Sequence, residues 1–573
     1  MKLSLMTVRN FKNINEDGVE IRIDNIVLLI GPNNCGKSTI LDAYEAFASS
    51  GKALPISSFH NEEGSNEIEI EATFNEVTAE DLEKLGNDWK FDHDELGGCI
   101  RLKWVWPGPD QKAKKFSWNP SDTAWQEGGM GGWDSLIASR VPFPLRIKPT
   151  DPPDEREKQI VAILSEAVKE SVKSDSTQVA GILEEISKLA DSVSETVQDK
   201  IDETCELVMG RLSDVFDGHT VKLEKAIGKL EPEKIIGSGS HLRIAKGDHA
   251  PLPLSVQGTG LQRAFLWSAL SALADSGHVK RGTKRLGADT MKILLIDEPE
   301  SFLHPPAVRD ARESLYKIAE LASWQVIAST HSPVFVDVSK PHTTIVRVNS
   351  TQDEQVRTFQ TESAQFSQDE REALKMIRLC HPTVNEFFFA EHVILVEGDT
   401  EMAVFQKLAE DSVHEAAKRI HVVNCLGKGN IPTFGKILNQ FGTGYVAVHD
   451  SDSPRCRRGD GTARNGAWSV NASIRETVDR RSAELPESFT LVHVPDFEEY
   501  YFQESVNSDK PFNALRKLAS GDFSNELDTL LDQILDGNHP CFYSSSQELS
   551  DRVVSYVEES VTDAERGLWV IDQ

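Results

Sequence analysis

The chain has 573 residues, of which 39% are hydrophobic and 27% are charged, so its composition is that of a globular protein and excludes a disordered or fibrous one. Asp and Glu total 91 against 61 Lys and Arg, a formal net charge of −30. This balance argues against a protein that coats nucleic acid with a broadly basic surface, but it leaves room for a local basic groove or an acidic metal site.

The cysteines and the apolar runs indicate the cellular compartment. The seven cysteines are widely spaced and never form a CxxC pair, which argues against a disulfide framework and a structural zinc site. The N-terminal residues alternate like a strand and contain no apolar core of signal-peptide length. No apolar run approaches the ~20 residues that span a bilayer. We therefore expect a soluble, cytoplasmic protein.

The first strong signal is a buried strand followed by a phosphate-binding motif. Residues 26–30 are apolar on both faces, as in a strand inside an α/β sheet. Residues 31–38 match GxxxxGK[ST], and a helical stretch begins at Thr39. In this motif backbone N–H groups and the helix N-terminus bind phosphate, Lys37 reaches the β- and γ-phosphates, and Ser38 holds Mg²⁺. The residues expected to bind ATP here are Asn33, Asn34, Gly36, Lys37, Ser38 and Thr39.

A long helical segment follows this first α/β region. After a predicted strand at 68–74 and a loop-rich stretch to about 150, Gly and Pro become rare between about 155 and 217. Apolar residues recur there at three- and four-residue steps, which predicts an amphipathic helix that packs on the domain or on a partner. These residues are Ile182, Ile186, Leu189, Val193, Val197 and Ile201.

A second buried strand, at 292–296, ends in acids. Asp297 and Glu298 follow it directly, as in a Walker B strand that delivers a Mg²⁺ ligand and then a glutamate that polarises the attacking water. The segment Ser-Val-Gln-Gly-Thr-Gly lies upstream at 255–260, and Ser-Thr-His lies downstream at 329–331.

This order of motifs resembles the ABC-type ATPase heads of the SMC and RecF kind, in which a long helical insertion splits the head. The resemblance places Ser255, Gly258 and Gly260 in the signature loop, which contacts the γ-phosphate held by a second head. It makes His331 the switch histidine.

The last third of the chain places carboxylates at strand ends. Glu397 follows a predicted strand at 392–396, and Asp450-Ser-Asp452 ends another at 445–449. Because the carboxyl ends of adjacent parallel strands converge, these three acids are expected to share one crevice. Carboxylates so close together need cations, and hard oxygen ligands suit Mg²⁺ or Mn²⁺. Two such ions about 4 Å apart would suit phosphodiester cleavage.

Glutamate followed by Asp-x-Asp at these strand ends resembles the Toprim domain, over about 390–510. The nuclease branch of that family implies Glu401 as a further metal ligand and Lys510 as a cation for the developing phosphorane, although an ordinary surface lysine is the alternative. A last metal ligand is expected at Glu498, with Glu499 left open. Arginines directly after the Asp-x-Asp either seat the phosphate backbone or form a solvated loop: Arg455, Arg457, Arg458 and Arg464.

An ABC-type head followed by a Toprim domain resembles the OLD (overcoming lysogenization defect) family of nucleases over nearly the whole chain. The resemblance implies an α/β fold with a helical dimerisation insert and a Rossmann-like Toprim domain that carries a helical C-terminal extension. The expected parts are the head at 1–150 and 221–365, the insert at 151–220, a linker at 366–388 and the Toprim domain at 389–573.

The family further implies a homodimer or higher oligomer that uses ATP with one Mg²⁺ at the head and two Mg²⁺ or Mn²⁺ ions at the Toprim site. Its expected activity is ATP-regulated cleavage of DNA, often in anti-phage defence. Members in the Gabija and retron systems accompany a helicase or a reverse transcriptase, so any such partner of this chain is expected to be encoded separately. A RecF- or SMC-like repair ATPase is the main alternative, in which the Toprim domain only binds DNA or partners. A topoisomerase or primase is a weaker one.

Overall fold

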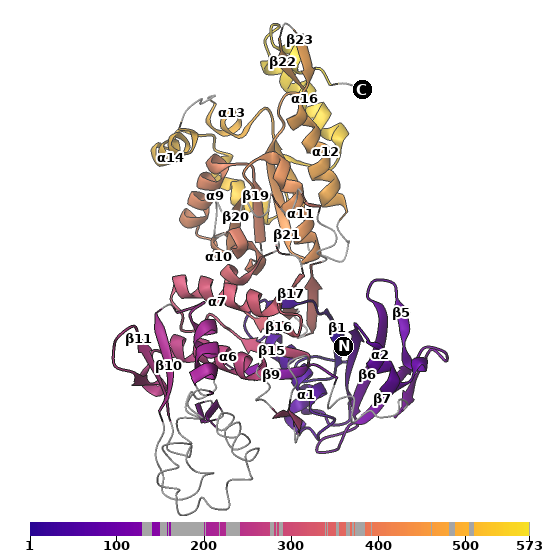
Figure 1. Cartoon of the computed structure of the whole chain (residues 1–573). Helices are drawn as coiled ribbons and strands as arrows, with labels where there is room; N and C mark the ends of the chain where they lie inside the picture. Colours follow the sequence, from indigo (N-terminus) through magenta and orange to yellow (C-terminus); the bar gives the residue numbers. More distant parts are fainter. Residues whose placement is uncertain are drawn as a thin grey trace, which may run out of the picture. The chain divides into compact units, whose positions relative to one another are not determined.

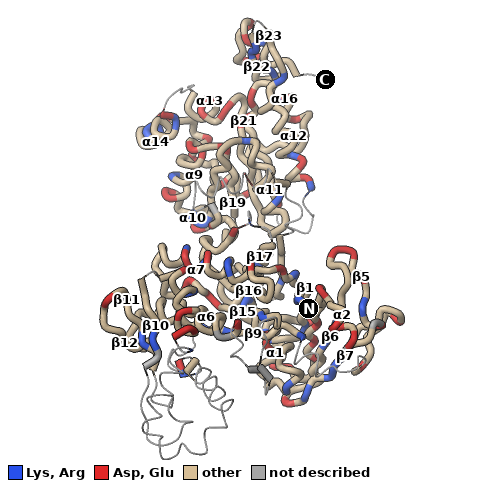
Figure 2. The backbone as a smooth tube through the Cα atoms, viewed as in Figure 1, with Lys and Arg blue, Asp and Glu red and all other residues tan. Residues whose placement is uncertain are grey.

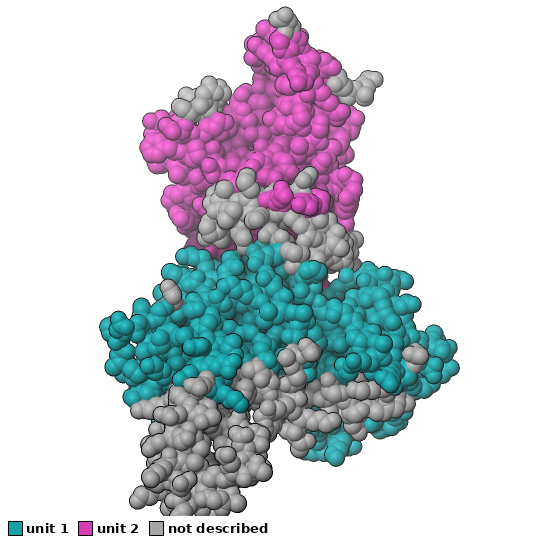
Figure 3. Space-filling view, viewed as in Figure 1, with its two compact units in different colours: residues 1–358 teal, residues 359–573 magenta. Residues whose placement is uncertain are grey.

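The computed structural model describes most of the chain as two compact units, residues 1–358 and 359–573, which are coloured separately in Figure 3. The described residues are 1–128, 140–148, 157–158, 160–161, 200, 202–216, 218–224, 241–275, 280–281, 284–285, 290–337, 340, 342–350, 355–361, 367–368, 372, 384–390, 392–459, 461–480, 487–503 and 509–571. The six apolar residues that define the predicted amphipathic helix lie outside them, as does most of the predicted linker at 366–388, whereas the end of that predicted segment, at 202–212, is described and helical.

A six-stranded sheet forms the centre of unit 1 and carries the phosphate-binding motif (Figure 1). Neighbouring strands pair in parallel from β17 to β9, which confirms the buried strands predicted at 26–30 and 292–296. In sheet order the strands are β18 (Val356–Gln360), β17 (Thr343–Ser350), β3 (Ile26–Ile30), β16 (Trp324–Ser329), β15 (Lys292–Asp297) and β9 (Phe143–Ile147).

Both faces of this sheet are covered, which explains why its central strands are apolar throughout. Leu294 and Ile296 point to the core on one face, whereas Ile293 and Leu295 point to the core on the other. One core includes residues of α6 (Thr259–Asp275) and α7 (Pro305–Ala319), and the other includes α1 (Lys37–Ala48).

An antiparallel seven-stranded sheet packs on the α1 side of unit 1. Its strands are β2 (Val19–Arg22), β1 (Lys2–Arg9), β4 (Ile68–Asn75), β6 (Gly97–Trp106), β7 (Lys114–Asn119), β8 (Ala124–Glu127) and β5 (Phe91–His93). The other described elements of unit 1 are α2 (Ala79–Leu85), β10 (His219–Glu224), β11 (His241–Lys246), β12 (Leu252–Pro253), β13 (Lys280–Arg281) and β14 (Lys284–Arg285).

Unit 2 is built on a five-stranded sheet whose first four strands are parallel, with only the edge strand β25 antiparallel. In sheet order the strands are β20 (Ile420–Asn424), β19 (His392–Val396), β21 (Gly444–Asp450), β24 (Phe489–His493) and β25 (Phe542–Tyr543). The helices are α9 (Asp399–Asp411), α10 (Glu415–Lys418), α11 (Ile431–Gln440), α12 (Gly466–Asp479), α13 (Phe497–Phe502), α14 (Lys510–Ser520), α15 (Leu530–Leu535) and α16 (Ser546–Ser560).

The parallel order of β20, β19, β21 and β24 brings their carboxyl ends to one edge, where ligands bind in open α/β sheets. The alternating βα pattern of unit 2 therefore confirms the predicted α/β architecture and places the sequence's acidic segments on that edge. None of the described helices has the length and apolarity needed to cross a membrane.

Candidate functional site

The phosphate loop in unit 1 joins the end of β3 to the start of α1 and needs glycine at two positions. Gly31 has φ 140°, and a Cβ there would lie 2.1 Å from the Val348 carbonyl oxygen. Gly36 has φ 104°, and its Cβ would lie 2.8 Å from Asn13. Lys37 is buried and its Nζ donates to the carbonyl oxygens of Gly31 at 2.9 Å and Pro32 at 2.6 Å. Its burial lowers the pKa of the Lys37 ammonium.

Asp297, at the end of β15, lies beside the phosphate loop although 259 residues separate it from Ser38. The Ser38 hydroxyl donates to its Oδ1 at 3.1 Å, and the Ser329 hydroxyl donates to the same oxygen at 2.7 Å. Parallel pairing of β15 with β16 sets Asp297 level with Ser329. The predicted pairing of a P-loop serine with a Walker B aspartate is therefore present in the geometry.

Arg146 completes this cluster and was missed from the sequence. It lies on the edge strand β9, is buried, and donates through Nη2 to Asp297 Oδ2 at 2.6 Å and to Asp42 Oδ1 on α1 at 3.0 Å. Its Nε and Nη1 have no hydrogen-bond acceptor. No sequence motif surrounds Arg146. Its place beside Asp297 follows from the pairing of β9 with β15 in the sheet.

Glu298 and His331 lie close together at the same sheet edge. Their side chains approach to 3.9 Å between Nε2 and Oε1, and the Glu298 carboxylate also accepts from Ser301 Oγ at 2.8 Å. The His331 backbone N–H donates to Glu300 Oε1 at 2.6 Å, so Glu300, which the sequence did not single out, fixes the histidine loop. Burial lowers the pKa of His331 and raises that of Glu300, which favours a neutral imidazole.

The predicted signature loop is exposed. Ser255 lies in a short 3-10 turn at Leu254–Val256, and Gly258 has open space around its Cα, whereas Gly260 in the first turn of α6 packs against Phe302. Within the described residues, no hydrogen bond or ion pair joins this loop to the phosphate loop. Asn33 and Asn34 are also exposed, and Thr39 is buried in α1.

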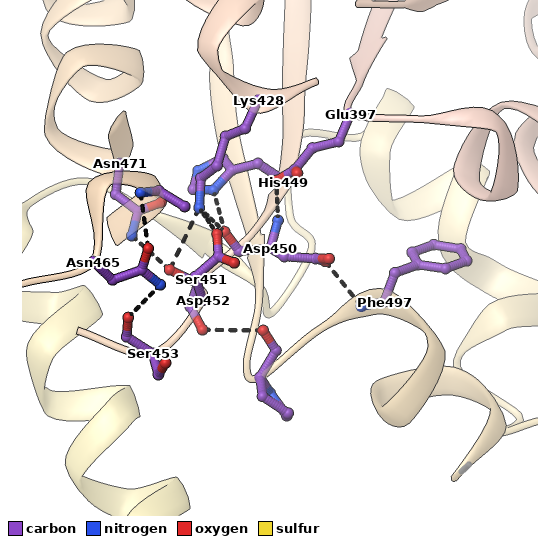
Figure 4. Close-up of polar contacts among 12 residues, drawn as sticks. Glu397, Lys428, His449, Asp450, Ser451, Asp452, Ser453, Asn465, Asn471 and Phe497 are labelled. Carbon is purple, nitrogen blue, oxygen red and sulfur yellow. Dashed lines mark hydrogen bonds and ion pairs between the residues drawn. The ribbon is translucent and has the colours of Figure 1, made fainter. Parts of the chain in front are cut away.

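The carboxylates of unit 2 gather at the edge predicted for them. The backbone N–H of Asp450 donates to Glu397 Oε1 at 2.7 Å, and Asp450 Oδ1 accepts from the Phe497 N–H at 2.9 Å (Figure 4). Burial raises the pKa of Glu397 to about 7. Burial, then the neighbouring Glu397, raise the pKa of Asp450 well above its usual range. These shifts mean that the site disfavours ionisation of both carboxyl groups, because they are buried close together with too little positive charge beside them.

Lys428 is the cation that the sequence analysis did not assign to this site. It lies on the loop after β20 and is buried, with Nζ 2.7 Å from Asp452 Oδ2 and 3.4 Å from the Ser451 carbonyl oxygen. It also donates to the Asp450 carbonyl oxygen. Asp452 has φ 57°, in the left-handed region. The Lys428 ammonium therefore holds the turn from Asp450 to Asp452 in this conformation through its hydrogen bonds (Figure 4). Its position after a neighbouring parallel strand is the only sequence signal for it.

Glu401 and Glu498 are both buried, on α9 and α13. Burial raises the pKa of Glu401, and the Glu498 carboxylate adds to the rise. Lys510 Nζ lies 3.1 Å from Glu498 Oε1, whereas Glu499 Oε1 accepts from the Tyr556 hydroxyl at 3.1 Å. The two adjacent glutamates thus face different partners, and only Glu498 faces Lys510.

The donor set suits a hard divalent cation in its chemistry. All the acids supply oxygen, and several are buried. Of the described residues, Lys428 and Lys510 are the only cations paired with them, so Mg²⁺ or Mn²⁺ would relieve the repulsion. Among the described residues, no three His, Cys, Asp or Glu side chains already stand in metal-ligand geometry.

Two family models match the chain. Residues 1–122 and 150–336 match the AAA ATPase domain, and residues 388–452 match the TOPRIM domain of overcoming lysogenization defect protein-like sequences. The second match contains Glu397, Glu401, Asp450 and Asp452. The two domain types expected from the sequence, an ATPase head and a Toprim domain, are thereby confirmed.

Three curated relatives are similar over much of the chain. The Old nuclease of Escherichia phage P2 is 24% identical over 468 residues, which cover 79% of this chain and 77% of that protein. The OLD nuclease of Thermus scotoductus is 29% identical over 282 residues, 49% of this chain and 51% of its own length. Endonuclease GajA of Bacillus cereus is 25% identical over 520 residues, 85% of this chain and 82% of its own length.

Proposed function

Because the chain belongs to the AAA ATPase domain family and carries an OLD-like TOPRIM domain, we propose that it is an ATP-regulated, divalent-metal-dependent DNA endonuclease. The observation that carries the proposal is the hydrogen-bonded pair Glu397 and Asp450 at the carboxyl edge of the unit 2 sheet. The similarity to proteins named as nucleases over more than three quarters of this chain supports it. A repair ATPase whose Toprim domain only binds would have no need of such buried, repelling acids.

The metal ligands we propose are Glu397, Glu401, Asp450, Asp452 and Glu498. A divalent ion there would supply an activated water and charge stabilisation for the leaving oxygen. The chain's own residues would do the rest. Lys428 holds the turn that presents Asp450 and Asp452. Lys510, now paired with Glu498, is placed to neutralise charge that builds on a phosphate.

In unit 1, the phosphate loop and Asp297 would bind Mg²⁺-ATP, with Glu298 and His331 acting on the attacking water and the γ-phosphate. The exposed Ser255 and Gly258 would contact the ATP of a second copy, so the functional state would be a homodimer or higher oligomer. ATP would then control cleavage through contact between two heads. A cytoplasmic role in anti-phage defence, with a helicase or reverse transcriptase encoded elsewhere, fits this reading.

The test uses supercoiled plasmid with Mg²⁺ or Mn²⁺, with and without ATP. Wild type should give nicked or linear DNA, Asp450→Ala should give none, and Asp522→Ala, which removes an exposed aspartate from the same unit, should match wild type. Lys37→Ala should lose the response to ATP. Equal cleavage by wild type and Asp450→Ala would disprove the nuclease site, and ATPase activity without any cleavage would favour the repair ATPase.

A further inference from the structure

A small arginine-rich hairpin extends from the strand that carries Asp450. It consists of β22 (Arg455–Arg458) and β23 (Gly461–Arg464), which form a two-stranded sheet separate from the five-stranded one (Figure 1). Its first residue lies three positions after Asp452. A hairpin of this size contributes little to a hydrophobic core.

Three of the four arginines share one face of this hairpin. Arg455 is paired with Arg464 across the strands, and Arg457 lies two residues further on the same face, about 7 Å away. Like charges directly opposite each other destabilise a strand pair. Arg458 points to the other face. Figure 2 shows short blue stretches of the backbone at β22 and β23.

The exposed arginines of the hairpin lack the ion pairs that several other arginines of unit 2 form. Arg475 and Arg552 each pair with a carboxylate on their own helix, and Arg480, directly after α12, pairs with Glu476 of that helix. In the described part of unit 2, no carboxylate lies within ion-pair distance of the exposed arginines of the hairpin, which are Arg457, Arg458 and Arg464. In a chain with a net charge of −30, a small hairpin that carries exposed guanidinium groups on both faces, with no ion-pair partner among the described residues, favours an anionic partner from outside the chain.

The hairpin is fixed at its base to the carboxylate edge. The backbone N–H of Asn465 donates to the Pro454 carbonyl oxygen at 2.9 Å, and its side-chain amide donates to the Ser453 carbonyl oxygen at 2.9 Å. The same side chain caps α12 by accepting from the Ala467 N–H at 3.1 Å. Asn471 on α12 donates to the Ser451 carbonyl oxygen at 2.9 Å. These bonds hold the arginines at a set distance from Asp450 and Asp452.

We propose that this hairpin binds the sugar-phosphate backbone of duplex DNA next to the carboxylate site. Arginine suits the role because its planar guanidinium makes two parallel hydrogen bonds to a phosphate. Such contacts set the register of the duplex without reading its sequence. The choice of DNA rests on the proposed function, whereas the binding of a polyanion rests on the hairpin itself.

The experiment measures binding of the full chain to a fluorescent duplex of about 30 base pairs without divalent metal, over ~50 to 200 mM salt. The variant replaces Arg457, Arg458 and Arg464 by glutamine. A matched control makes the same change in charge at exposed arginines elsewhere: Arg309, Arg419 and Arg480. The variant should bind at least about tenfold more weakly, with a salt slope about 2 to 3 less steep, because each lost phosphate contact removes ~0.9.

The control should show the same salt dependence of binding as wild type. Arg→Lys at the three hairpin positions should retain most of that salt dependence. Equal losses in variant and control, or no loss in either, would overturn the proposal, as would a wild-type chain that does not bind duplex. Because binding is measured without metal, the result is independent of cleavage. A chain that binds through the hairpin but never cuts plasmid would refute the nuclease proposal and leave this one standing.

Discussion

The phosphate loop of unit 1 and the carboxylate edge of unit 2 solve the same problem of buried charge in different ways. In unit 1, both oxygens of Asp297 are satisfied by groups of the protein, two hydroxyls and the Arg146 guanidinium. In unit 2, Glu397 accepts from the Asp450 N–H, Asp450 accepts from the Phe497 N–H and Asp452 pairs with Lys428. Burial raises the pKa of Glu397 and Asp450. Each carboxylate oxygen of Asp297 thus has a hydrogen-bond donor from the protein, whereas the acids of unit 2 outnumber the cations beside them, Lys428 and Lys510.

Because of that contrast, substitutions at the two sites should have opposite effects on the stability of the fold. Removing a partner of Asp297 leaves a buried charge alone and should weaken the fold. Removing an acid from the carboxylate edge relieves repulsion, so it should cost activity and leave the fold as stable or more so.

The largest effect is expected at the centre of the carboxylate edge. Asp450→Asn keeps the acceptor for the Phe497 N–H but removes a buried ionisable group beside Glu397. Cleavage should fall at least ~1000-fold, because a proposed metal ligand is lost. Without metal, the melting temperature should rise, and the further rise on adding Mn²⁺ should shrink. Thermal unfolding with and without Mn²⁺ measures this, with Asp522→Asn as control. An unchanged response to Mn²⁺ would show that Asp450 holds no ion.

In unit 1 the corresponding change should cost stability. Arg146→Gln leaves Asp297 and Asp42 without their shared cation, and breaking such a buried pair costs about 3 kcal/mol. The loss should be smaller with Mg²⁺-ATP, since the ion replaces the missing charge. Urea unfolding followed by tryptophan fluorescence reports mainly on this unit, because eight of the ten tryptophans lie in it. Arg309→Gln is the control, and an equal loss with and without Mg²⁺-ATP would contradict the explanation.

Lys428 tests whether a side-chain cation contributes to the carboxylate edge. Lys428→Met frees the turn at Asp452 and should slow cleavage about 30-fold at low Mn²⁺, with partial recovery at high Mn²⁺ as the metal replaces the ammonium. The cleavage rate of Lys428→Arg should lie between those of wild type and Lys428→Met. The measurement is cleavage rate against Mn²⁺ concentration, with Lys418→Met as control. If the Met variant's titration coincides with that of wild type, Lys428 has no part in the site.

Beneath the carboxylate edge, His493 is buried among aromatic rings, and burial lowers its pKa well below the usual value. The groups that face it are His449, His539, Tyr500 and Tyr501. A depressed pKa stabilises the fold above about pH 6.5, and that stability is lost as the pH falls, by about 1.4 kcal/mol per pH unit. His493→Phe should reduce this slope, measured from urea midpoints between about pH 7 and 5. An unchanged slope, as expected for the exposed His249→Gln, would mean that His493 takes up no proton on unfolding.

The sequence was enough to predict which distant residues meet wherever the topology of a parallel sheet brings them together. The meeting of Ser38 with Asp297, and of Glu397 with Asp450, follows from parallel strands whose carboxyl ends share an edge. Arg146 and Lys428 could not be found in this way, because a lone arginine on a strand and a lysine between glycines occur in many proteins. Their roles depend on which strand lies beside which, and the sheet order supplies that.

Which of Glu498 and Glu499 is the metal ligand depends on the rotation of the short helix α13 about its axis. The substitutions that test this choice have the smallest expected effect on cleavage. Asp496 caps α13 by accepting from the Glu499 N–H at 2.8 Å. That bond sets the helix so that Glu498 is buried beside Lys510, whereas Glu499 accepts from Tyr556. Glu499→Gln keeps an acceptor for the Tyr556 hydroxyl and should change the cleavage rate by less than about threefold, whereas Glu498→Gln should lower it at least about tenfold. The opposite order would make Glu499 the ligand and would mean that α13 turns when metal binds.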